Sequence, residues 1–450
     1  MNMERLKEII HFYNPWWSTK EVPKELLPDY ERPVLADILS YLDLNRVVVL
    51  KGPRRTGKTT LLYQIAADLL KKGVNPENIL FLSLDTIAEL EPLDDVVNAY
   101  QQLTRKVLHP ATRTYFLLDE VQFLKDWPLL IKKYFDRKVG ITFIVSGSAA
   151  SLIRKGSESL AGRTIEETIL PFTFFEYLAY HERDSRLQGL IAEMRNTWSF
   201  HALPNKDDLV PYGTTIHIRF DDYLAQGGFP HLLQTKEKIM RQRLLREDVI
   251  EKAIYRDLVE LYQIKKPAAL EKLFLYLCEH SSELLNISNI ATSLGLSREY
   301  TERYLDYLEA AFLIFRYGKY AKSVEEQVRS MEKCYVTDPG LLQLAFRPDA
   351  GKAVESMAAR HLMARKAFYW RDERHEVDLV LDEKEGVMPI EVKYQGNIGI
   401  SDTKGLVKFL NTFKEKSGIM VTKDLLEEKY IQGMTIRHIP AWLFLLVADK

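Results

Sequence analysis

Eight residues in the first part of the chain have the types and spacing of a phosphate-binding loop. They follow the pattern G-x-x-x-x-G-K-T and run Gly52-Pro53-Arg54-Arg55-Thr56-Gly57-Lys58-Thr59. Glycines let backbone N–H groups wrap an anion, and the N-terminus of a following helix adds positive dipole character. In such a loop Lys58 reaches the β- and γ-phosphates of a nucleotide, and the hydroxyl of Thr59 binds Mg²⁺.

A second group of residues has the chemistry needed to hydrolyse a phosphate bond. Asp119 and Glu120 follow the apolar run Tyr115–Leu118, about 60 residues after the loop. We expect Asp119 to hold Mg²⁺ through water, and Glu120 to orient or deprotonate the attacking water. Ser146 and Ser148 end the next apolar run, where a hydroxyl can sense the γ-phosphate. A simple turn is the alternative for these serines.

The loop needs a strand before it and a helix after it, and the sequence supplies both. Val47–Leu50 is an apolar strand, and a helix is expected from Thr60 onward. Further apolar runs follow at 79–84, 115–120 and 141–146, with helical stretches between them. Continuous apolar strands separated by helices predict a parallel sheet covered on both faces. A chance glycine-rich turn is a poor alternative in this setting. The predicted nucleotide site comprises the eight loop residues with Thr60, Ser146 and Ser148.

Length and composition limit the class of protein. The chain has 450 residues, 46% hydrophobic and 28% charged, with a net charge of −1. These values are typical of a soluble globular chain with about three domains, and no global basic field attracts nucleic acid. Cys278 and Cys334 are too few for a disulfide framework or a cysteine metal site. The N-terminus lacks a signal-peptide core, and no apolar run reaches the ~18 residues of a membrane span, so we expect a cytoplasmic protein without a membrane partner.

A helix-turn-helix pattern lies in the second half of the chain. Helices are expected over Leu270–Cys278, Ile287–Leu294 and Arg298–Ala311, and a hairpin that forms a wing is expected from Phe312. Pro267–Tyr320 holds five Lys and Arg against seven Asp and Glu. Duplex binding gains much of its affinity from phosphate neutralisation, so this composition argues against strong DNA binding by this part alone. An intramolecular or protein-contact role is the alternative.

The last hundred residues place charged side chains at intervals of two on expected strands. Glu376 and Asp378 share one face of a strand, and Glu391 and Lys393 share one face of another. If these strands pair in register, Asp378, Glu391 and Lys393 converge, and Glu355 can reach them from the preceding helix, expected over 353–366. The solvated face of a hairpin is the alternative, because charges alternate there as well.

At this point most of the chain resembles the archaeal-type ATPases of the AAA+ superfamily. The motifs that carry the resemblance are Gly52–Thr59, Leu118–Gln122, Ser146–Ser148, Gly162-Arg163, Pro171–Leu178 and Gln226–Pro230. The resemblance implies an α/β fold: a P-loop AAA+ parallel sheet with a helical lid, a winged helix and a C-terminal α/β nuclease-like domain. It also makes Arg163 the candidate for stabilising the charge that develops on the transferred phosphoryl group. Whether Arg163 acts in its own subunit or on a neighbour is open, and a helix-capping or surface ion-pair role is the alternative.

The expected organisation has five parts. They are an N-terminal helical segment at 1–46, the ATPase core at 47–178, an insertion and helical lid at 179–266, the winged helix at 267–345, and the nuclease-like domain at 346–450.

The C-terminal part resembles the PD-(D/E)xK nuclease fold. That resemblance implies Mg²⁺ on Asp378 and Glu391, Lys393 near the nucleophilic water or scissile phosphate, and Glu355 as an additional acid. Val377 stands where the motif has proline. A metal site of this kind predicts that Mg²⁺ or Mn²⁺ stabilises the C-terminal domain.

These patterns predict an Mg²⁺-dependent ATPase that controls a DNA-binding or DNA-processing half, with nuclease activity as one form of that processing. The expected partners are ATP or ADP, duplex, forked or junction DNA, and further copies of the chain. One alternative is a nucleotide-dependent switch that recognises a protein and uses an inactive nuclease-like domain for docking. Another is a DNA-binding factor without cleavage activity.

Overall fold

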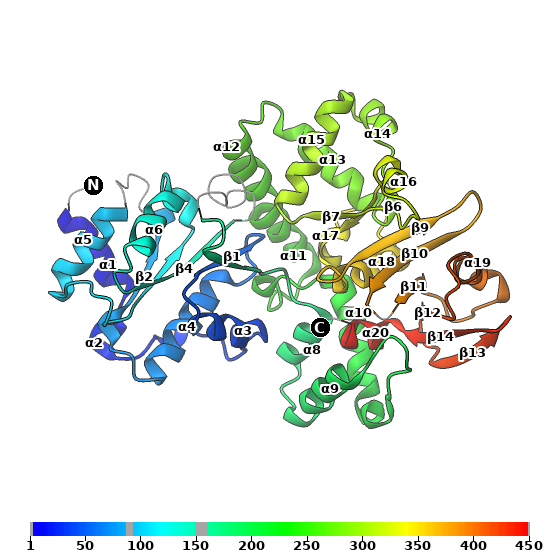
Figure 1. Ribbon diagram of the computed structural model, residues 1–450, viewed down its shortest axis with the longest axis horizontal. Helices are drawn as coiled ribbons and strands as arrows, with labels where there is room; N and C mark the ends of the chain where they lie inside the picture. The colour runs from blue at the N-terminus through cyan, green and yellow to red at the C-terminus, as the bar shows by residue number, and fades with distance from the viewer. Residues whose placement is uncertain (1–2, 87–92, 149–159, 385, 449–450) are drawn as a thin grey trace. The chain divides into compact units, whose positions relative to one another are not determined.

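The chain divides into two compact units that interleave along the sequence. A computed structural model describes residues 3–86, 93–148, 160–384 and 386–448 (Figure 1). The first unit consists of Met1–Leu170, Glu251–Lys265 and Ala310–Phe312, and the second of Pro171–Ile250, Lys266–Glu309 and Leu313–Lys450. None of the described helices is both long and apolar enough to cross a membrane.

A five-stranded parallel sheet forms the centre of the first unit. Its order is β2-β3-β4-β1-β5, and its strands are β1 (Val47–Gly52), β2 (Ile79–Ser83), β3 (Thr114–Asp119), β4 (Ile141–Ser148) and β5 (Thr164–Thr168). Strands β1 to β4 are largely buried, as their continuous apolar sequences predict. The parallel sheet expected for the nucleotide-binding core is therefore confirmed.

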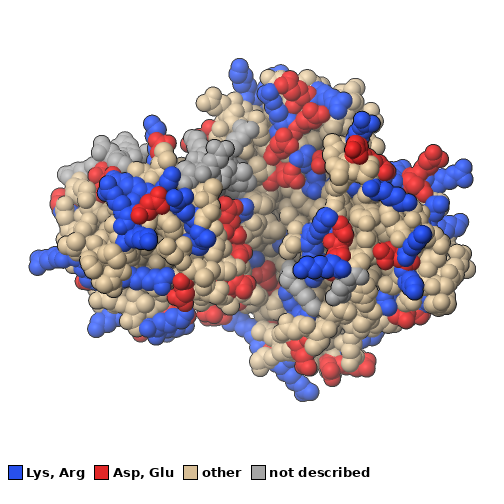
Figure 2. All heavy atoms as spheres, viewed as in Figure 1, with Lys and Arg blue, Asp and Glu red and all other residues tan. Residues whose placement is uncertain are grey.

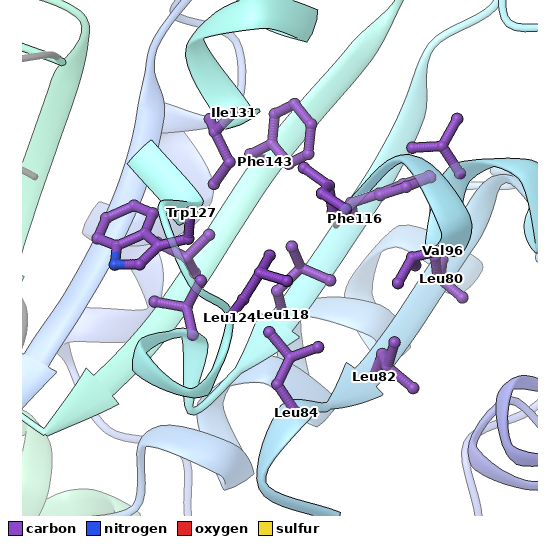
Figure 3. Close-up of a cluster of buried hydrophobic side chains, with 14 of the residues drawn as sticks. Leu80, Leu82, Leu84, Val96, Phe116, Leu118, Leu124, Trp127, Ile131 and Phe143 are labelled. Atoms are coloured by element: carbon purple, nitrogen blue, oxygen red, sulfur yellow. The ribbon is translucent and has the colours of Figure 1, made fainter. Parts of the chain in front are cut away.

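Helices supply an apolar core on each face of this sheet. One core joins side chains of α1, α5 and α6 to the sheet, and Figure 3 shows part of it, including Leu118, Trp127 and Phe143. The other core contains Trp16 and residues of α3 and α4. The helices of this unit that precede β5 are α1 (Met3–Tyr13), α2 (Trp16–Thr19), η1 (Lys24–Leu26), α3 (Val34–Tyr41), α4 (Lys58–Lys71), η2 (Pro76–Asn78), η3 (Leu84–Thr86), α5 (Leu93–Thr104), η4 (Val121–Phe123) and α6 (Trp127–Asp136).

The N-terminal segment packs along β2, which is an edge strand of the sheet. The side chain of Asn14 accepts a hydrogen bond from the N–H of Phe81 at 2.7 Å and donates one to its C=O at 2.8 Å. The indole N–H groups of Trp16 and Trp17 both donate to the C=O of Ile79, at 3.1 and 2.9 Å. Trp16 is fully buried. The tryptophan pair therefore serves packing and not an exposed aromatic platform.

A helical region follows β5 and contributes to both units. Its elements are α8 (Phe174–His181), α9 (Ser185–Thr197), η5 (Asp207–Tyr212), α10 (Gly213–Gln226), η6 (Pro230–Leu232), α11 (Lys238–Leu245), the π-helix η7 (Arg246–Leu258) and α12 (Val259–Tyr262). Residues 171–250 belong to the second unit and 251–265 to the first. The expected insertion and lid, 179–266, is thus divided between the units.

Three helices and a small sheet follow in the second unit. The helices are α13 (Pro267–Glu279), α14 (Ile287–Leu294) and α15 (Arg298–Ala310), close to the expected positions. The antiparallel sheet has the order β6-β8-β7, with β6 (Glu283–Leu284), β7 (Ile314–Tyr317) and β8 (Lys333–Val336). The short helices α16 (Val324–Arg329) and α17 (Pro339–Leu342) lie on either side of β8 in sequence. We call the three strands the small sheet; the winged-helix role of this part stays a prediction.

The last hundred residues form a six-stranded mixed sheet. Its order is β13-β14-β12-β11-β10-β9, with β11, β12 and β14 parallel to one another. The elements are α18 (Ala350–His361), β9 (Ala367–Arg371), β10 (Glu376–Glu383), β11 (Gly386–Lys393), η8 (Ile400–Thr403), α19 (Lys404–Phe413), β12 (Ser417–Thr422), β13 (Glu427–Ile431), β14 (Met434–Pro440) and α20 (Ala441–Val447). Helix α20 is apolar on all sides, so no helical period marks it in the sequence. The helix expected over 353–366 ends at His361.

Candidate functional site

The phosphate-binding loop joins β1 to α4 and requires glycine at two positions. Gly52 has a φ of 155°, and a Cβ there would lie 2.2 Å from the C=O oxygen of Ile169. Gly57 has a φ of 93° and precedes the first turn of α4. The hydroxyl of Thr56 donates to the C=O of Pro53 at 3.0 Å, and Arg32 donates to the C=O of Thr56 at 3.1 Å. These bonds hold the loop in an anion-binding form at a helix N-terminus.

Lys58 is buried within the loop that it serves. Its ammonium donates to the C=O groups of Gly52 at 3.0 Å and Pro53 at 2.6 Å. Burial lowers the pKa of Lys58, and the nearby carboxylates of Glu120 and Asp119 partly oppose that shift. No carboxylate forms an ion pair with this ammonium among the described residues. Its charge is therefore balanced by weak neutral acceptors, which a phosphate can replace.

The hydroxyl of Thr59 and the carboxylate of Asp119 meet at the carboxyl edge of the sheet. Thr59 Oγ1 donates to Asp119 Oδ2 at 2.6 Å, while Asp119 Oδ1 accepts from the N–H of Glu120 at 3.1 Å and from the hydroxyl of Ser146. Hydroxyl and carboxylate oxygens are ligands that Mg²⁺ prefers. The residues present therefore fit a magnesium ion at this point, as the sequence predicts.

Glu120 follows Asp119 in a left-handed backbone conformation, with a φ of 53°. Its carboxylate accepts a hydrogen bond from the side chain of Gln122. Burial raises the pKa of Glu120, and the Lys58 ammonium opposes the shift. A raised pKa makes this carboxylate a better acceptor for a proton from water.

The two serines that end β4 have different surroundings. Ser146 is fully buried and donates to Asp119, so its hydroxyl positions the carboxylate that is predicted to bind Mg²⁺. Ser148 lies opposite Gly52 in the pairing of β4 with β1 and is therefore level with the start of the loop. Thr60 is the third residue of α4, directly after Thr59. The γ-phosphate contact expected of the serines stays a prediction.

A contact that sequence reasoning missed joins the loop to the π-helix η7. The guanidinium of Arg54 donates to both carboxylate oxygens of Asp257, at 2.7 and 2.6 Å. Burial works against the charge of Arg54, yet the hydrogen bonds that it donates to Asp257 leave its pKa above the ordinary value. In the same helix, the guanidinium of Arg256 lies 5.1 Å from the ring centre of Phe123. Phe123 follows Asp119 and Glu120 closely in the sequence. No sequence motif marks Asp257, because the pairing joins positions two hundred residues apart.

Arg163 does not lie at the phosphate-binding edge of its own domain. It immediately precedes β5, and its C=O accepts a hydrogen bond from Val47, the first residue of β1. Its guanidinium donates to Asp136 at 2.8 Å. The loop begins at the other end of β1, about 17 Å away at ~3.3 Å per residue. This separation argues against action on the γ-phosphate within one subunit, and the role of Arg163 on a neighbouring subunit stays a prediction.

A second cluster of charges lies where α18, β10 and β11 meet β8. Lys393 contacts Glu391 at 2.6 Å, and the N–H of Val392 donates to Asp378 Oδ2 at 2.9 Å. The ammonium of Lys333, from β8, then lies 2.7 Å from Glu376, 2.8 Å from Glu355 and 2.9 Å from Asp378. We call Lys333 and these three acids the Lys333 cluster. The structure thus brings together the four residues predicted for a nuclease site and adds Lys333 and Glu376.

Burial and mutual repulsion set the charge states in this cluster. Burial, with the charge of Asp378, raises the pKa of Glu355 to about 8 and that of Glu391 to about 8. Burial alone would also raise the pKa of Asp378, but Lys333 and Lys393 hold it below its usual value. The acids in turn raise the pKa of Lys333 well above its ordinary value, although burial works in the opposite direction.

The residues of this cluster do not fit a divalent metal. Mg²⁺ needs several oxygen ligands in near-octahedral geometry. Here one oxygen of Asp378 contacts Lys333, the other accepts the Val392 N–H, and Lys393 contacts Glu391. No group of three or more His, Cys, Asp or Glu among the described residues has the geometry to hold a metal ion. The metal-binding roles predicted for Asp378 and Glu391, with Glu355 as an additional acid, are therefore corrected, because an ammonium already lies among the acids.

Comparison with known protein families identifies the class of domain that forms most of the first unit. Residues 44–178 match a family model described as an AAA domain. Together with the parallel sheet and the phosphate-binding loop, this match identifies the segment as an AAA-type P-loop ATPase domain. Residues 218–350 and 350–442 match two domains of unknown function, DUF8612 and DUF4143.

Individual proteins are similar to the chain over most of its length. It is 23% identical over 420 residues to an uncharacterized protein of Haemophilus influenzae, covering 91% of this chain and 97% of that one. It is 25% identical over 364 residues to an uncharacterized protein of Methanocaldococcus jannaschii, covering 77% and 74%. Among solved structures, the ORC1 protein of Aeropyrum pernix in complex with DNA matches 78% of this chain and 97% of its own, with 11% identity and a TM-score of 0.30. A TM-score this low does not establish a shared overall structure.

The burial of Lys333 predicts a large effect on stability. Lys333→Ala leaves the buried Asp378 and the partly buried Glu355 and Glu376 without their cation, and we expect it to lower the free energy of unfolding of the second unit by about 3–5 kcal/mol. Lys352→Ala is the matched control, because Lys352 is half-buried and pairs with Glu283 at 2.6 Å. That change is expected to cost about 0–1 kcal/mol. Urea unfolding measures both, and equal losses would contradict the assignment.

Proposed function

We propose that this protein is a nucleotide-dependent switch whose AAA-type domain binds and hydrolyses ATP with Mg²⁺ and whose second unit engages a protein partner. The paired hydrogen bonds between Arg54 and Asp257 carry this proposal. They connect the phosphate-binding loop to η7, and the chain directly before Glu251 and directly after Lys265 belongs to the second unit. A change in the loop can therefore reach the segment that links the two units along the chain.

The residues of the ATP site divide the work of hydrolysis. Lys58 and the loop N–H groups bind the phosphates, and Thr59 and Asp119 hold the metal ion. Mg²⁺ bound there neutralises charge on the β- and γ-phosphates. Ser146 fixes Asp119 through a hydrogen bond. Glu120, buried and with a raised pKa, accepts the proton of the water that attacks the γ-phosphorus.

In the first step of the proposed switch, the Lys58 ammonium exchanges its C=O acceptors for a bound phosphate. The ammonium contacts the C=O groups of Gly52 and Pro53, at the start of the loop that also carries Arg54. A bound phosphate attracts this ammonium more strongly than neutral carbonyls do. Its withdrawal from Pro53 changes the loop next to Arg54 and hence the pairing of Arg54 with Asp257.

Charge in the second unit favours a protein partner over DNA. The exposed arginines of α15 are paired within the helix, Arg298 with Glu302 at 2.9 Å and Arg303 with Glu299 at 2.7 Å. On the face drawn in Figure 2, basic and acidic side chains are interspersed and form no continuous basic surface over the described residues. Phosphate neutralisation needs unpaired cations, which this helix does not offer.

In contrast to the paired charges of α15, the surface around α16 carries exposed apolar side chains. Val324 and Val328 are 71% and 78% exposed, although both are apolar. Val328 lines a hollow of about 770 Å³ together with Leu285, Ile287 and Met331. Exposed apolar side chains beside a hollow are typical of a protein-contact surface. They support the proposal of a protein partner for the second unit.

The ATP site gives the first test. Lys58→Ala is expected to weaken ATP binding about 10- to 100-fold, because it removes a charge-assisted contact. Glu120→Gln is expected to bind ATP normally and to hydrolyse it about 10²- to 10⁴-fold more slowly, because the shape survives and the proton acceptor does not. Binding of a fluorescent ATP analogue and release of phosphate measure the two effects. Normal turnover in Glu120→Gln would remove Glu120 from its role.

The link between Arg54 and Asp257 gives the second test. Asp257→Asn keeps the size of the side chain but removes its charge, and we expect ATP to lose its effect on hydrogen exchange over residues 238–262. Glu247→Gln is the matched control, because Glu247 pairs with Arg243 on the surface of the same helical stretch. The control should respond to ATP as the wild type does. An unchanged response in Asp257→Asn, with ATP still bound, would exclude this route.

The class of partner gives the third test. Glu120→Gln with ATP traps the nucleotide-bound state, and we expect it to leave duplex, forked and junction DNA unshifted at physiological salt. With Mg²⁺ or Mn²⁺ added, none of these DNAs is expected to be cut, because Lys333 lies among the acids of the C-terminal sheet. Specific shifts that depend on ATP, or cut products lost in Asp378→Ala, would favour the DNA-processing alternative.

A further inference from the structure

Lys333 is surrounded as a coordinated cation would be. Its ammonium has three N–H donors and three carboxylate neighbours, Glu355, Glu376 and Asp378, at 2.7 to 2.9 Å. The residue is 1% exposed, so water does not share in solvating the charge. Lysine has no further donor beyond these three. The ammonium donates hydrogen bonds to Glu376 and Asp378 and forms an ion pair with Glu355, so protein carboxylates balance its charge.

The position of Lys333 is fixed by the small sheet. Lys333 begins β8, where it pairs with Leu284 of β6 and Tyr317 of β7. Because β8 is the middle strand, its backbone is bonded on both sides. The lysine stem thus enters the acid pocket from a rigid support and not from a mobile loop.

Further bonds join the small sheet to the same elements that carry the acids. The hydroxyl of Tyr335 donates to the C=O of Asp378 at 3.3 Å, and that of Tyr317 donates to the C=O of Ala359 at 2.8 Å. The hydroxyls of Ser281 and Ser356 lie 2.9 Å apart. The Lys333 cluster is therefore the charged centre of a hydrogen-bonded contact between the small sheet and α18 with β10.

We propose that Lys333 is the resident cation of this acid pocket: it takes the place that a divalent metal would need, and it fastens the small sheet to the C-terminal sheet. The wild-type protein accordingly binds no divalent metal at Asp378 and Glu391. This assignment goes beyond the proposed ATP-dependent function and does not depend on it.

Electrostatics explains why the lysine and a metal exclude each other. A divalent ion on Asp378 and Glu355 would lie within a few ångströms of the ammonium that contacts the same two carboxylates, and like charges repel strongly at that distance in a buried site. Lys333 is almost completely buried on a strand bonded on both sides, which leaves its ammonium little space in which to move aside. Removal of the lysine reverses the balance, because it leaves three acids around a vacant space. Three carboxylates that share one cation at 2.7 to 2.9 Å can then share a hard divalent cation instead.

Metal-dependent melting of the full-length chain tests the assignment, with Mn²⁺ alone as the probe. All proteins carry Asp119→Asn, which removes a metal ligand at the ATP site and so limits binding there. In this background Lys333→Ala is expected to gain about 5–10 °C in the melting temperature of the second unit at Mn²⁺ about 100-fold above its dissociation constant. The unsubstituted cluster and the control Lys352→Ala are expected to gain nothing.

Two results would overturn the proposal. One is a Mn²⁺-dependent rise in the protein with intact Lys333 that disappears in Asp378→Asn, because the pocket would then bind metal beside the lysine. The other is a folded Lys333→Ala protein that takes up no Mn²⁺, because the lysine would then not stand in a metal's place. If Lys333→Ala does not fold, Lys333→Ala/Glu376→Gln replaces it, since one charge of each sign is removed. Binding of Mn²⁺ to that double variant, measured by calorimetry, decides between the same two outcomes.

Discussion

The close approach of Gly52 to Ile169 is the constraint on which the ATP site depends. It holds the end of β1 against the chain that leaves β5, with no room for a side chain between them. Parallel strands end at one edge of a sheet, so Gly52, Asp119 and Ser146 are brought to the same edge from three strands. The phosphate-binding loop, the oxygens proposed to hold Mg²⁺ and the proposed proton acceptor Glu120 therefore lie close together because of the direction of the strands and one glycine.

Two buried lysines show how the same side chain can serve opposite purposes. Lys58 is held by the C=O groups of Gly52 and Pro53, and burial lowers its pKa. Lys333 is held by three carboxylates, which raise its pKa well above the ordinary value. The first lysine is under-compensated and gains from an incoming phosphate. The second is fully compensated, so it has nothing to gain from a ligand and acts as part of the fold.

The sequence predicts where the phosphate-binding loop, Asp119 and Glu120 lie, because these residues are local signals at the ends of apolar strands. The loop, Asp119 and Glu120 each stand at the end of a run that can only be a buried parallel strand. The convergence of Asp378, Glu391 and Lys393 also follows from the period of two along paired strands. The sequence does not predict Lys333, because it lies 45 residues before Asp378 in a different sheet and no spacing rule joins the two. The role proposed for Arg163 follows from family resemblance alone. That resemblance does not indicate at which end of β5 the residue lies.

The hydrogen bonds that the N-terminal segment makes to the edge strand β2 have a consequence for assembly. An edge strand presents unpaired N–H and C=O groups that can recruit a strand from another molecule. Here Asn14 takes both outward groups of Phe81, and Trp16 and Trp17 share the C=O of Ile79. Side chains thus make the hydrogen bonds that a neighbouring strand would make, although no strand lies there. This border of the sheet is closed to extension, so copies of the chain that associate must do so through another surface, and loss of the first seventeen residues would leave an open template for aggregation.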